Sequence, residues 1–363
     1  MKKILVYIIF SIVCIKVHTQ SVFWVSNNPN DVELAHYANL QQAIDVAQPG
    51  DTLLVYPSAL SYGSVTINKP LAIIGAGYEM DTLLQPALEI STIKNNTTVA
   101  LTVNSGGSGS YISGITGSVQ LIACSNVKVY RNYSAVRIEN CNQIELISNL
   151  FSGGFAGPIC LCCASIRYKP YSLLVIESSN IIISNSLFNN SIIQGGTCDS
   201  DGGSIYTDGN STLIIIKNNM IRDDVVVTNA TFFNNIFLRP QYITYGFFNC
   251  IVEKNIFDLP YNINDSRISV LNPVYNQFGV NTSLLFVGYP TQGSYSYDSR
   301  WQLQANSPAK GYGINGEDCG IFGGDLPYKL SGIADRPLIY SLDVPFSVGG
   351  NNVNIHIKVR AEN

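Results

Sequence analysis

The sequence predicts an all-β protein, a right-handed parallel β-helix with an N-terminal capping helix and a short C-terminal β-hairpin tail. Three observations predict this fold: a short phrase that recurs along the chain, period-two apolar alternation inside each copy, and almost no helical periodicity. Strand-forming repeats near 20 residues indicate a solenoid, because each coil buries its apolar face against the next.

The recurring phrase first stands at residues 124–132, CSNVKVYRN, and again at 141–149, CNQIELISN. Four further copies begin at residues 178, 211, 227 and 247, so that the ninth positions are separated by 17, 37, 33, 16 and 20 residues. Positions four and six are apolar or cysteine in every copy, which predicts a strand with one buried face.

Amides recur at fixed places in this phrase. The third position carries an amide in five of the six copies, and the ninth carries Asn132, Asn149, Ser186, Asn219, Asn235 and Asn255. Because coils stack about 4.8 Å apart, equivalent amides are expected to hydrogen-bond up the stack. By the same logic Cys124 and Cys141, at position one, are interpreted as one column of core filling.

The start of the stack carries a predicted helix. Asn39 resembles an N-cap and is followed by LQQ, and one helical face would hold Leu40, Ala43, Ile44 and Ala47. Pro49-Gly50 ends this pattern, and strands are expected at residues 52–56, 64–68 and 71–74. The helix would cover the open strand edge of the first coil.

The other end of the chain predicts a hairpin. Residues 353–359 alternate apolar and polar, and they follow a Gly-Gly-Asn-Asn turn and the apolar stretch 338–344. Residues 1–19 have the layout of a secretory signal peptide, with Lys2 and Lys3 before an apolar run too short to span a bilayer. We therefore expect a signal peptide at 1–19, a β-helix domain at 20–335 that includes the cap, and a tail at 336–363.

Composition limits the function. The 363 residues carry a net charge of −4 with 13% charged residues and no lysine or arginine run, which excludes a nucleic-acid-binding protein. We expect a secreted or cell-surface monomer with no transmembrane segment after processing. The disulfide pairing of Cys160, Cys162, Cys163 and Cys198 stays open, as does the mode of surface attachment.

Several stretches resemble exported bacterial right-handed parallel β-helix surface proteins of the pectin-lyase-like fold. They are LQQAIDVAQPGDTLLVYP at 40–57, YGSVTINKPLAIIGAGY at 62–78, NSPAKGYGINGEDCGIFGG at 306–324 and the repeat corners. The resemblance covers roughly residues 22–335 and implies the fold. It implies no one activity, since this scaffold hosts lyases, hydrolases, adhesins and stalks.

The resemblance points to one acidic region. Family hydrolases use several aspartates with a histidine, and Asp208, Asp223 and Asp224 look like the first elements, whereas the remaining elements are missing. The glycine-rich loop CDSDGGSIYTDG makes Asp199, Asp201 and Asp208 calcium candidates, because short Asp-x-Asp-Gly loops can offer several oxygen ligands.

A second candidate site is aromatic. Tyr295, Tyr297 and Trp301 cluster in QGSYSYDSRW, and exposed aromatic rings can stack on sugars. The sequence therefore predicts a non-catalytic scaffold, adhesin or glycan-binding protein, with no catalytic residues and no cofactor other than a possible calcium ion. The alternative is a polysaccharide lyase or glycoside hydrolase acting on an acidic polymer such as pectate or alginate.

Overall fold

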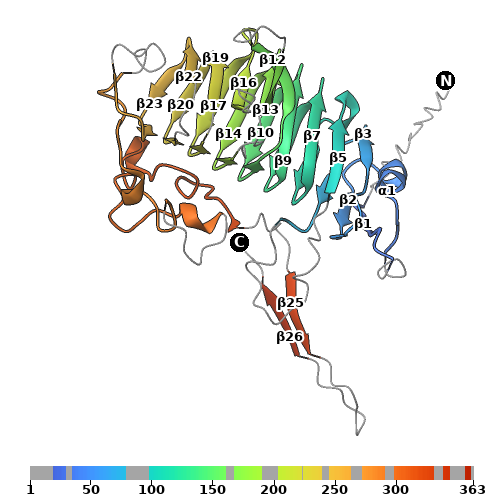
Figure 1. Cartoon of the computed structure of the whole chain (residues 1–363). Coiled ribbons are helices and arrows are strands. Elements are labelled where there is room, and N and C mark those ends of the chain that lie inside the picture. Colours follow the sequence, from blue (N-terminus) through green and yellow to red (C-terminus); the bar gives the residue numbers. More distant parts are fainter. Residues whose placement is uncertain are drawn as a thin grey trace, which may run out of the picture.

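The structure is a computed structural model of the chain (Figure 1). It describes residues 19–29, 35–78, 98–160, 167–189, 203–222, 224–238, 245–262, 272–290, 298–330, 338–343 and 356–360. Of the predicted signal peptide, only Thr19 falls within these ranges. The segment boundaries after residues 19 and 335 therefore stay predictions.

Sheet A is a ten-stranded sheet in which every strand is parallel to its neighbours. Its order is β1, β2, β4, β6, β8, β10, β14, β17, β20, β23, so each coil of the chain adds one strand. Their bounds are Val22–Val25, Thr52–Val55, Ala72–Ile74, Tyr111–Ser113, Ser125–Tyr130, Asn142–Ile147, Ser179–Ser184, Thr212–Lys217, Ala230–Phe233 and Ile251–Glu253.

Sheet B, of 14 strands, forms the opposite wall of the coils. One row holds β3 Ser64–Ile67, β5 Thr98–Val103, β7 Thr116–Ile122, β9 Tyr133–Glu139, β13 Arg167–Ile176, β16 Gly203–Thr207, β19 Asp224–Thr228 and β22 Tyr245–Phe248. A second row of two-residue strands holds β11 Leu150–Phe151, β15 Leu187–Phe188, β18 Met220–Ile221, β21 Ile236–Phe237 and β24 Ile256–Phe257. These pairs are all parallel, and only β12, Phe155–Cys160, joins antiparallel to β13. Together the two sheets form the predicted parallel β-helix.

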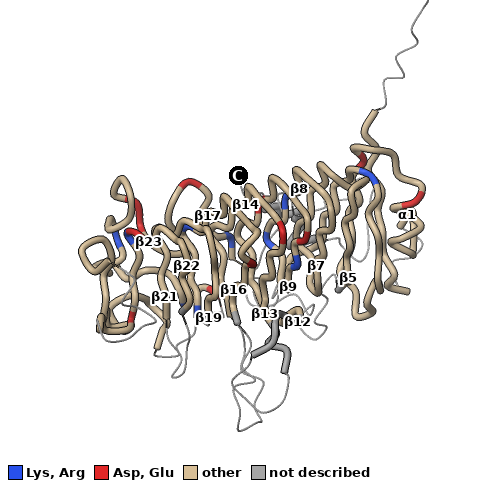
Figure 2. The backbone as a smooth tube through the Cα atoms, turned by 90° about the horizontal axis from the view of Figure 1, so that it is seen from above, with Lys and Arg blue, Asp and Glu red and all other residues tan. Residues whose placement is uncertain are grey.

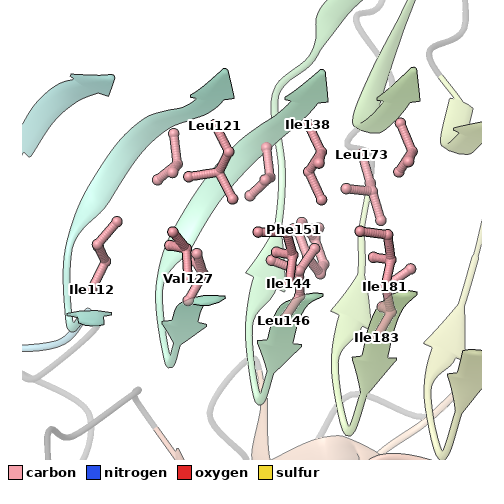
Figure 3. Packing of buried hydrophobic residues seen from close by; sticks show 14 of the residues in the cluster. Ile112, Leu121, Val127, Ile138, Ile144, Leu146, Phe151, Leu173, Ile181 and Ile183 are labelled. Carbon is pink, nitrogen blue, oxygen red and sulfur yellow. The ribbon is translucent and has the colours of Figure 1, made fainter. Parts of the chain in front are cut away.

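The sequence repeat is the structural coil. Ile144 at position four pairs in register with Val127 on one side and Ile181 on the other, and Ile214 pairs with Ala230. These inward side chains are buried in one continuous apolar core between the sheets (Figure 3). The prediction that positions four and six of each copy face the core is therefore confirmed.

The ninth-position asparagines form the predicted ladder inside the corner. The backbone N–H of Asn132 donates to Oδ1 of Asn149 at 3.0 Å, and Asn219 donates in the same way to Asn235 at 3.0 Å. Ser186 fills one rung with its hydroxyl. Asn276, which the repeat did not include, accepts from Asn255 and adds one more rung. The ladder satisfies buried backbone groups that face no strand at the corner.

Two other columns adopt left-handed backbone. Position three has φ between 52° and 58°, and position eight has φ between 51° and 59° in all six copies. Asparagine tolerates this region better than most residues, which explains the amide at position three. Stacking adds to this in places, since Asn249 Nδ2 donates to Asn229 Oδ1 at 2.7 Å.

Helix α1, Leu40–Val46, confirms the predicted N-terminal cap. Asn39 Oδ1 accepts from the backbone N–H of Gln42 at 3.0 Å, as an N-cap does. The predicted inner face is buried against the first coil: Leu40, Ala43, Ile44 and Ala47. The helix closes the end of the core that no earlier coil covers.

Between β24 and the tail, the described residues 272–290 and 298–330 form no regular strand. Short 3₁₀ helices occur at Thr282–Leu284, Ser299–Trp301 and Ile314–Gly316, and an earlier one at Ser105–Gly107. The tail is a two-stranded antiparallel sheet of β25, Leu338–Asp343, and β26, His356–Arg360, which confirms the predicted hairpin (Figure 1). No helix within the described ranges is long and apolar enough to cross a membrane.

Residues 298–330, here called the flank segment, lie along the outside of the coils. Its apolar residues pack against the outer face of the two-residue strands of sheet B, in a second cluster that includes Leu187, Ile236, Trp301, Cys319 and Ile321. The position-eight asparagines hold it. Asn185 Nδ2 donates to the carbonyls of Ile321 and Gly323 at 3.0 and 2.6 Å.

The flank segment runs from the last coils back toward the first. Asn234 Oδ1 accepts from the backbone N–H of Ile314 at 2.7 Å, and Asn218 Nδ2 donates to the Asp318 carbonyl at 3.1 Å. Further along, the Tyr328 hydroxyl is hydrogen-bonded to that of Tyr78, which follows β4 and is the last residue of the described range 35–78. The segment therefore ties together coils that lie far apart in the sequence.

Candidate functional site

The outer face of sheet A carries a groove of about 1030 Å³. It crosses six consecutive strands, β8, β10, β14, β17, β20 and β23, and therefore runs along the axis of the solenoid. Five spacings of about 4.8 Å give it a length of roughly 24 Å. A hollow of this shape suits an extended chain better than a compact molecule.

One wall of the groove is the position-three column, whose left-handed backbone turns the side chains outward. Five members are amides and the sixth is aliphatic: Asn126, Gln143, Asn180, Leu213, Asn229 and Asn249. Each primary amide offers two donors and an acceptor. The wall is therefore a row of neutral hydrogen-bonding groups with one apolar interruption at Leu213.

The floor of the groove is the position-five column, on the outward face of the strands. Its members are Lys128, Glu145, Ile182, Ile215, Thr231 and Ile251. Ile251 is 57% exposed and Ile215 36%, so the chain leaves aliphatic surface open to solvent here. Contiguous exposed apolar surface in a polar surround is typical of a ligand-binding groove.

Charge in the groove is confined to one end. Lys128 Nζ lies 3.4 Å from Glu145 Oε2, and Tyr130 Oη donates to the same oxygen at 2.6 Å. Burial, together with the hydrogen bond to Glu145, raises the pKa of Tyr130 above its usual value. Within the described lining, the amine and the carboxylate thus neutralise each other. Figure 2 shows that charged residues are also sparse along the rest of the coils.

A second hollow of about 300 Å³ adjoins the first and shares Glu145, Ile182 and Ile215 with it. Its far side is formed by Asp325 and Leu326 of the flank segment. The two hollows together make one depression across sheet A, bounded by the amide wall on one side and by the flank segment on the other.

The predicted acidic site is only partly described. Asp208 holds a turn: its carboxylate accepts the backbone N–H groups of Glu177 at 3.1 Å and of Ser211 at 3.0 Å. Asp224 is the first residue of β19, which pairs in parallel with β16. Asp208 directly follows β16 and lies beside Thr228, the last residue of β19. Four residues of strand separate the two levels, about 13 Å. These two aspartates therefore do not converge at the backbone level.

The remaining acidic candidates, Asp199, Asp201 and Asp223, lie outside the described residues. Within the described ranges, no group of three or more His, Cys, Asp or Glu side chains is placed to hold a metal ion. Calcium binding by Asp199, Asp201 and Asp208 stays a prediction, and the described part of that set uses its oxygens on backbone N–H groups.

The predicted aromatic site is also only partly described, because Tyr295 and Tyr297 lie outside the described ranges. Trp301 is 1% exposed and belongs to the cluster under the flank segment. Its ring lies edge-on to Phe286, with centroids 5.4 Å apart, and the Arg222 guanidinium lies 5.1 Å from its centroid. In this arrangement the Trp301 ring has no free face for a sugar.

The cysteines of the repeat form the expected column. The sulfur atoms of Cys124 and Cys141 lie 3.6 Å apart, both thiols are free, and Cys141 N–H donates to the Ser178 hydroxyl of the next coil. The hydrogen bond from the Cys124 thiol lowers the pKa of Cys141. Stacking therefore accounts for these two residues.

The groove residues themselves were not predicted as a site. The amide column at position three was visible in the repeat, but its regularity was assigned to stacking. Its outward direction depends on the left-handed backbone, which sequence spacing alone does not report. The mixture of charged, aliphatic and hydroxyl residues at position five was the other available signal.

The fold and the groove together define a class: an all-β parallel β-helix protein with a neutral, elongated groove along one solvent-facing sheet. No family model matches the chain, and no curated protein is significantly similar to it.

Three solved structures have some likeness to the chain. A pectate lyase, Pel9A, is 13% identical with a TM-score of 0.41, covering 85% of this chain and 98% of that one. An alginate lyase from Paenibacillus sp. str. FPU-7 is 14% identical with a TM-score of 0.35, covering 75% and 97%. A tailspike, gp49, of Acinetobacter baumannii bacteriophage Fri1, a capsular polysaccharide depolymerase, is 11% identical with a TM-score of 0.21, covering 80% and 63%. The fold assignment rests on the strand order and register of this chain.

Proposed function

We propose that this protein is a non-catalytic, exported or cell-surface β-helix that binds a polysaccharide chain along the groove of sheet A. The observation that carries the proposal is the row of outward amides across six coils, interrupted at Leu213, beside the aliphatic side chains of the groove floor. Amides hydrogen-bond to hydroxyl groups, and aliphatic surface packs on the C–H faces of sugar rings. An extended glycan offers both in a linear repeat.

The groove favours a neutral polymer over an acidic one. A uronate carboxylate would seek a cation or several N–H donors, whereas the amine of Lys128 already faces Glu145 at 3.4 Å. The floor beyond these two residues is uncharged in the described lining: Ile182, Ile215, Thr231 and Ile251. Burying a carboxylate against aliphatic side chains is costly without such partners.

The same lining speaks against a hydrolase site in the groove. Glycoside hydrolysis needs two carboxyl groups flanking the scissile bond in most families. Glu145 is the one carboxylate among the described residues that line the larger hollow, and the carboxylate that the adjoining hollow adds, Asp325, lies at its far side on the flank segment. A binding role therefore needs only the amides and aliphatic side chains that the groove has. Export is proposed separately, from the predicted leader at residues 1–19.

The test is retention of polysaccharides by the purified chain in affinity electrophoresis, across a panel of neutral and acidic polymers that includes pectate and alginate. Ile215→Glu introduces a charge on the groove floor, and Ile122→Glu is its matched control because both isoleucines are 36% exposed on strands of opposite sheets. We expect at least tenfold weaker retention for Ile215→Glu and unchanged retention for Ile122→Glu.

Two results would overturn the proposal. One is the absence of retention for every polymer in the panel. The other is release of unsaturated uronate products, detected by their ultraviolet absorbance, when pectate or alginate is supplied with calcium, which would establish a lyase instead.

A further inference from the structure

The outer face of sheet A continues beyond the groove to the first coils, where it carries Trp24. Strand β1 alternates, so that Val25 is buried in the core, Phe23 packs against that core, and Trp24 points to the other side with 42% of its surface exposed. The first strand of sheet A therefore exposes an indole ring to solvent on the outer face of the sheet.

The Trp24 ring is supported by two further aromatic side chains. The ring of His36 lies 5.8 Å from it at an interplanar angle of 33°, and the ring of Tyr56 lies 6.4 Å away at 57°. His36 is held in place because its Nδ1 accepts the backbone N–H of Trp24 at 3.0 Å. These three side chains are here called the aromatic platform: Trp24 lies in β1, Tyr56 directly follows β2, and the backbone N–H of His36 donates to the Trp24 carbonyl at 2.9 Å.

The aromatic platform and the groove lie on the same outer face of sheet A, in neighbouring columns. The groove-floor column continues from Lys128 through Tyr111, Ala72 and Thr52 to Val22, two residues before Trp24 on β1. Trp24 itself is in register, through Leu54, Ile74 and Ser113, with Tyr130, two residues after Lys128 on β8. Four strand spacings of about 4.8 Å place Trp24 roughly 19 Å from Tyr130. Tyr111 and Tyr130, with centroids 5.4 Å apart, lie between the platform and the groove.

The chemistry of the platform matches a sugar ring. An exposed indole with an open face gains free energy by stacking on an apolar surface while its edges stay polar. The C–H face of a pyranose is such a surface, and its hydroxyls remain available to water and to neighbouring amides. A linear glycan leaving the groove along the sheet would pass over this platform.

We propose that Trp24, with His36 and Tyr56, forms an outlying sugar subsite that stacks on a pyranose ring of a glycan extending beyond the groove. This inference rests on the proposed function for the occupant, but it predicts a separate contact. Binding should therefore strengthen with glycan length after the groove is full, and the gain should depend on Trp24.

The experiment uses the fluorescence of the full chain. The sequence has two tryptophans, and Trp301 is 1% exposed, so a Trp301→Phe variant reports on Trp24 alone. Fragments of graded length, from a polymer that the protein retains, are titrated into it. We expect a saturable blue shift of Trp24 emission with long fragments and none with fragments that only span the groove.

Affinity gives the second readout. Trp24→Ala should weaken binding of long fragments about tenfold, the effect of about 1.4 kcal/mol of stacking, and leave short fragments unchanged. Trp24→Phe should retain most of the affinity, because it keeps a ring. Leu60→Ala, at another exposed apolar residue near the same end (55% exposed), is the control and should change neither.

The outcomes separate the two proposals, with the Ile215→Glu/Trp301→Phe double variant as the deciding protein. The platform is overturned and the groove stands if two results occur together. The double variant fails to bind, and long fragments do not shift the Trp24 emission of the Trp301→Phe variant. The groove is overturned and the platform stands if the double variant retains the polymer as before and long fragments still shift its Trp24 emission. If the panel polymers and their fragments neither bind nor move Trp24 emission, both are overturned.

Discussion

Asn235 and Asn255 occupy the same corner of consecutive coils and are joined by two hydrogen bonds. The backbone N–H of Asn235 donates to Oδ1 of Asn255 at 3.0 Å, and its Nδ2 donates to the same oxygen at 2.9 Å. Asn235 Nδ2 also donates to the Ile216 carbonyl at 2.8 Å. Both side chains are fully buried, so they supply the hydrogen bonds that water cannot give to the buried backbone N–H and carbonyl groups at this corner.

Replacing a ladder asparagine should therefore destabilise the fold strongly. Asn235→Ala leaves a buried N–H and buried carbonyls without this partner, and we expect a loss of about 3 kcal/mol, measured from the urea midpoint. Asn235→Ser should lose less, because Ser186 fills the equivalent rung with a hydroxyl. Equal midpoints for Asn235→Ala and the parent protein would contradict the ladder's role.

Leu213 should be a site where substitution stabilises the protein. It has φ of 53° and is 67% exposed, whereas its column neighbours Asn180 and Asn229 are amides. A branched apolar residue in left-handed backbone costs about 1 kcal/mol relative to asparagine. Leu213→Asn should therefore raise the urea midpoint and Asn180→Leu should lower it. A lower midpoint for Leu213→Asn would show that the Leu213 side chain makes a compensating contact.

The flank segment should loosen without global unfolding when its anchor is removed. Asn185→Gly keeps the backbone at φ of 51° but removes the bonds to the carbonyls of Ile321 and Gly323. We expect faster amide exchange at Tyr328, whose N–H donates to Ile321, and faster proteolysis within residues 314–328. Asn180→Gly is the control, since that exposed residue shares the φ but lies in the groove wall. Unchanged exchange in Asn185→Gly would show that apolar packing alone holds the segment.

The two ladder cysteines should be replaceable by serine. Cys124 and Cys141 are free thiols with sulfurs 3.6 Å apart, and serine already occupies their position in two later coils, at Ser178 and Ser211. Each Cys→Ser change should shift stability by less than about 1 kcal/mol, because serine fits this position in later coils and, in Cys141→Ser, the hydroxyl can accept the Cys124 backbone N–H. A larger loss on urea denaturation would indicate that the sulfur fills space that serine leaves empty.

Stability should fall in alkaline solution. Burial raises the pKa of Cys319 to about 12, from its usual value of 9.0. Between these values the unfolded chain releases a proton that the native chain keeps, so the free energy of unfolding falls as pH rises. Cys319→Ala should lower stability at pH 7 through the cavity it leaves and should flatten the decline above pH 9. An equally steep decline in the variant would assign the effect to other groups, such as Tyr130 and Tyr312, whose pKa values are also raised.

The sequence by itself determined the coil, the ladder and the cap. Each depends on local rules: strand alternation assigns Ile144 to the core, the capping preference of Asn39 begins α1, and equal spacing stacks Asn219 on Asn235. These rules hold whatever lies outside the coil. The inner face of a solenoid is formed by every copy in the same way, so pattern alone locates it.

Only the tertiary structure decided which outer surfaces stay open. Trp24 and Trp301 are the two tryptophans of the sequence, yet Trp24 is 42% exposed and Trp301 is 1% exposed. The difference arises because the flank segment folds back on the coils through Asn185, Asn218 and Asn234 and buries its own tryptophan there. Exposure at an outer position depends on which distant segment covers it, and nothing in the local alternation of a strand records that contact.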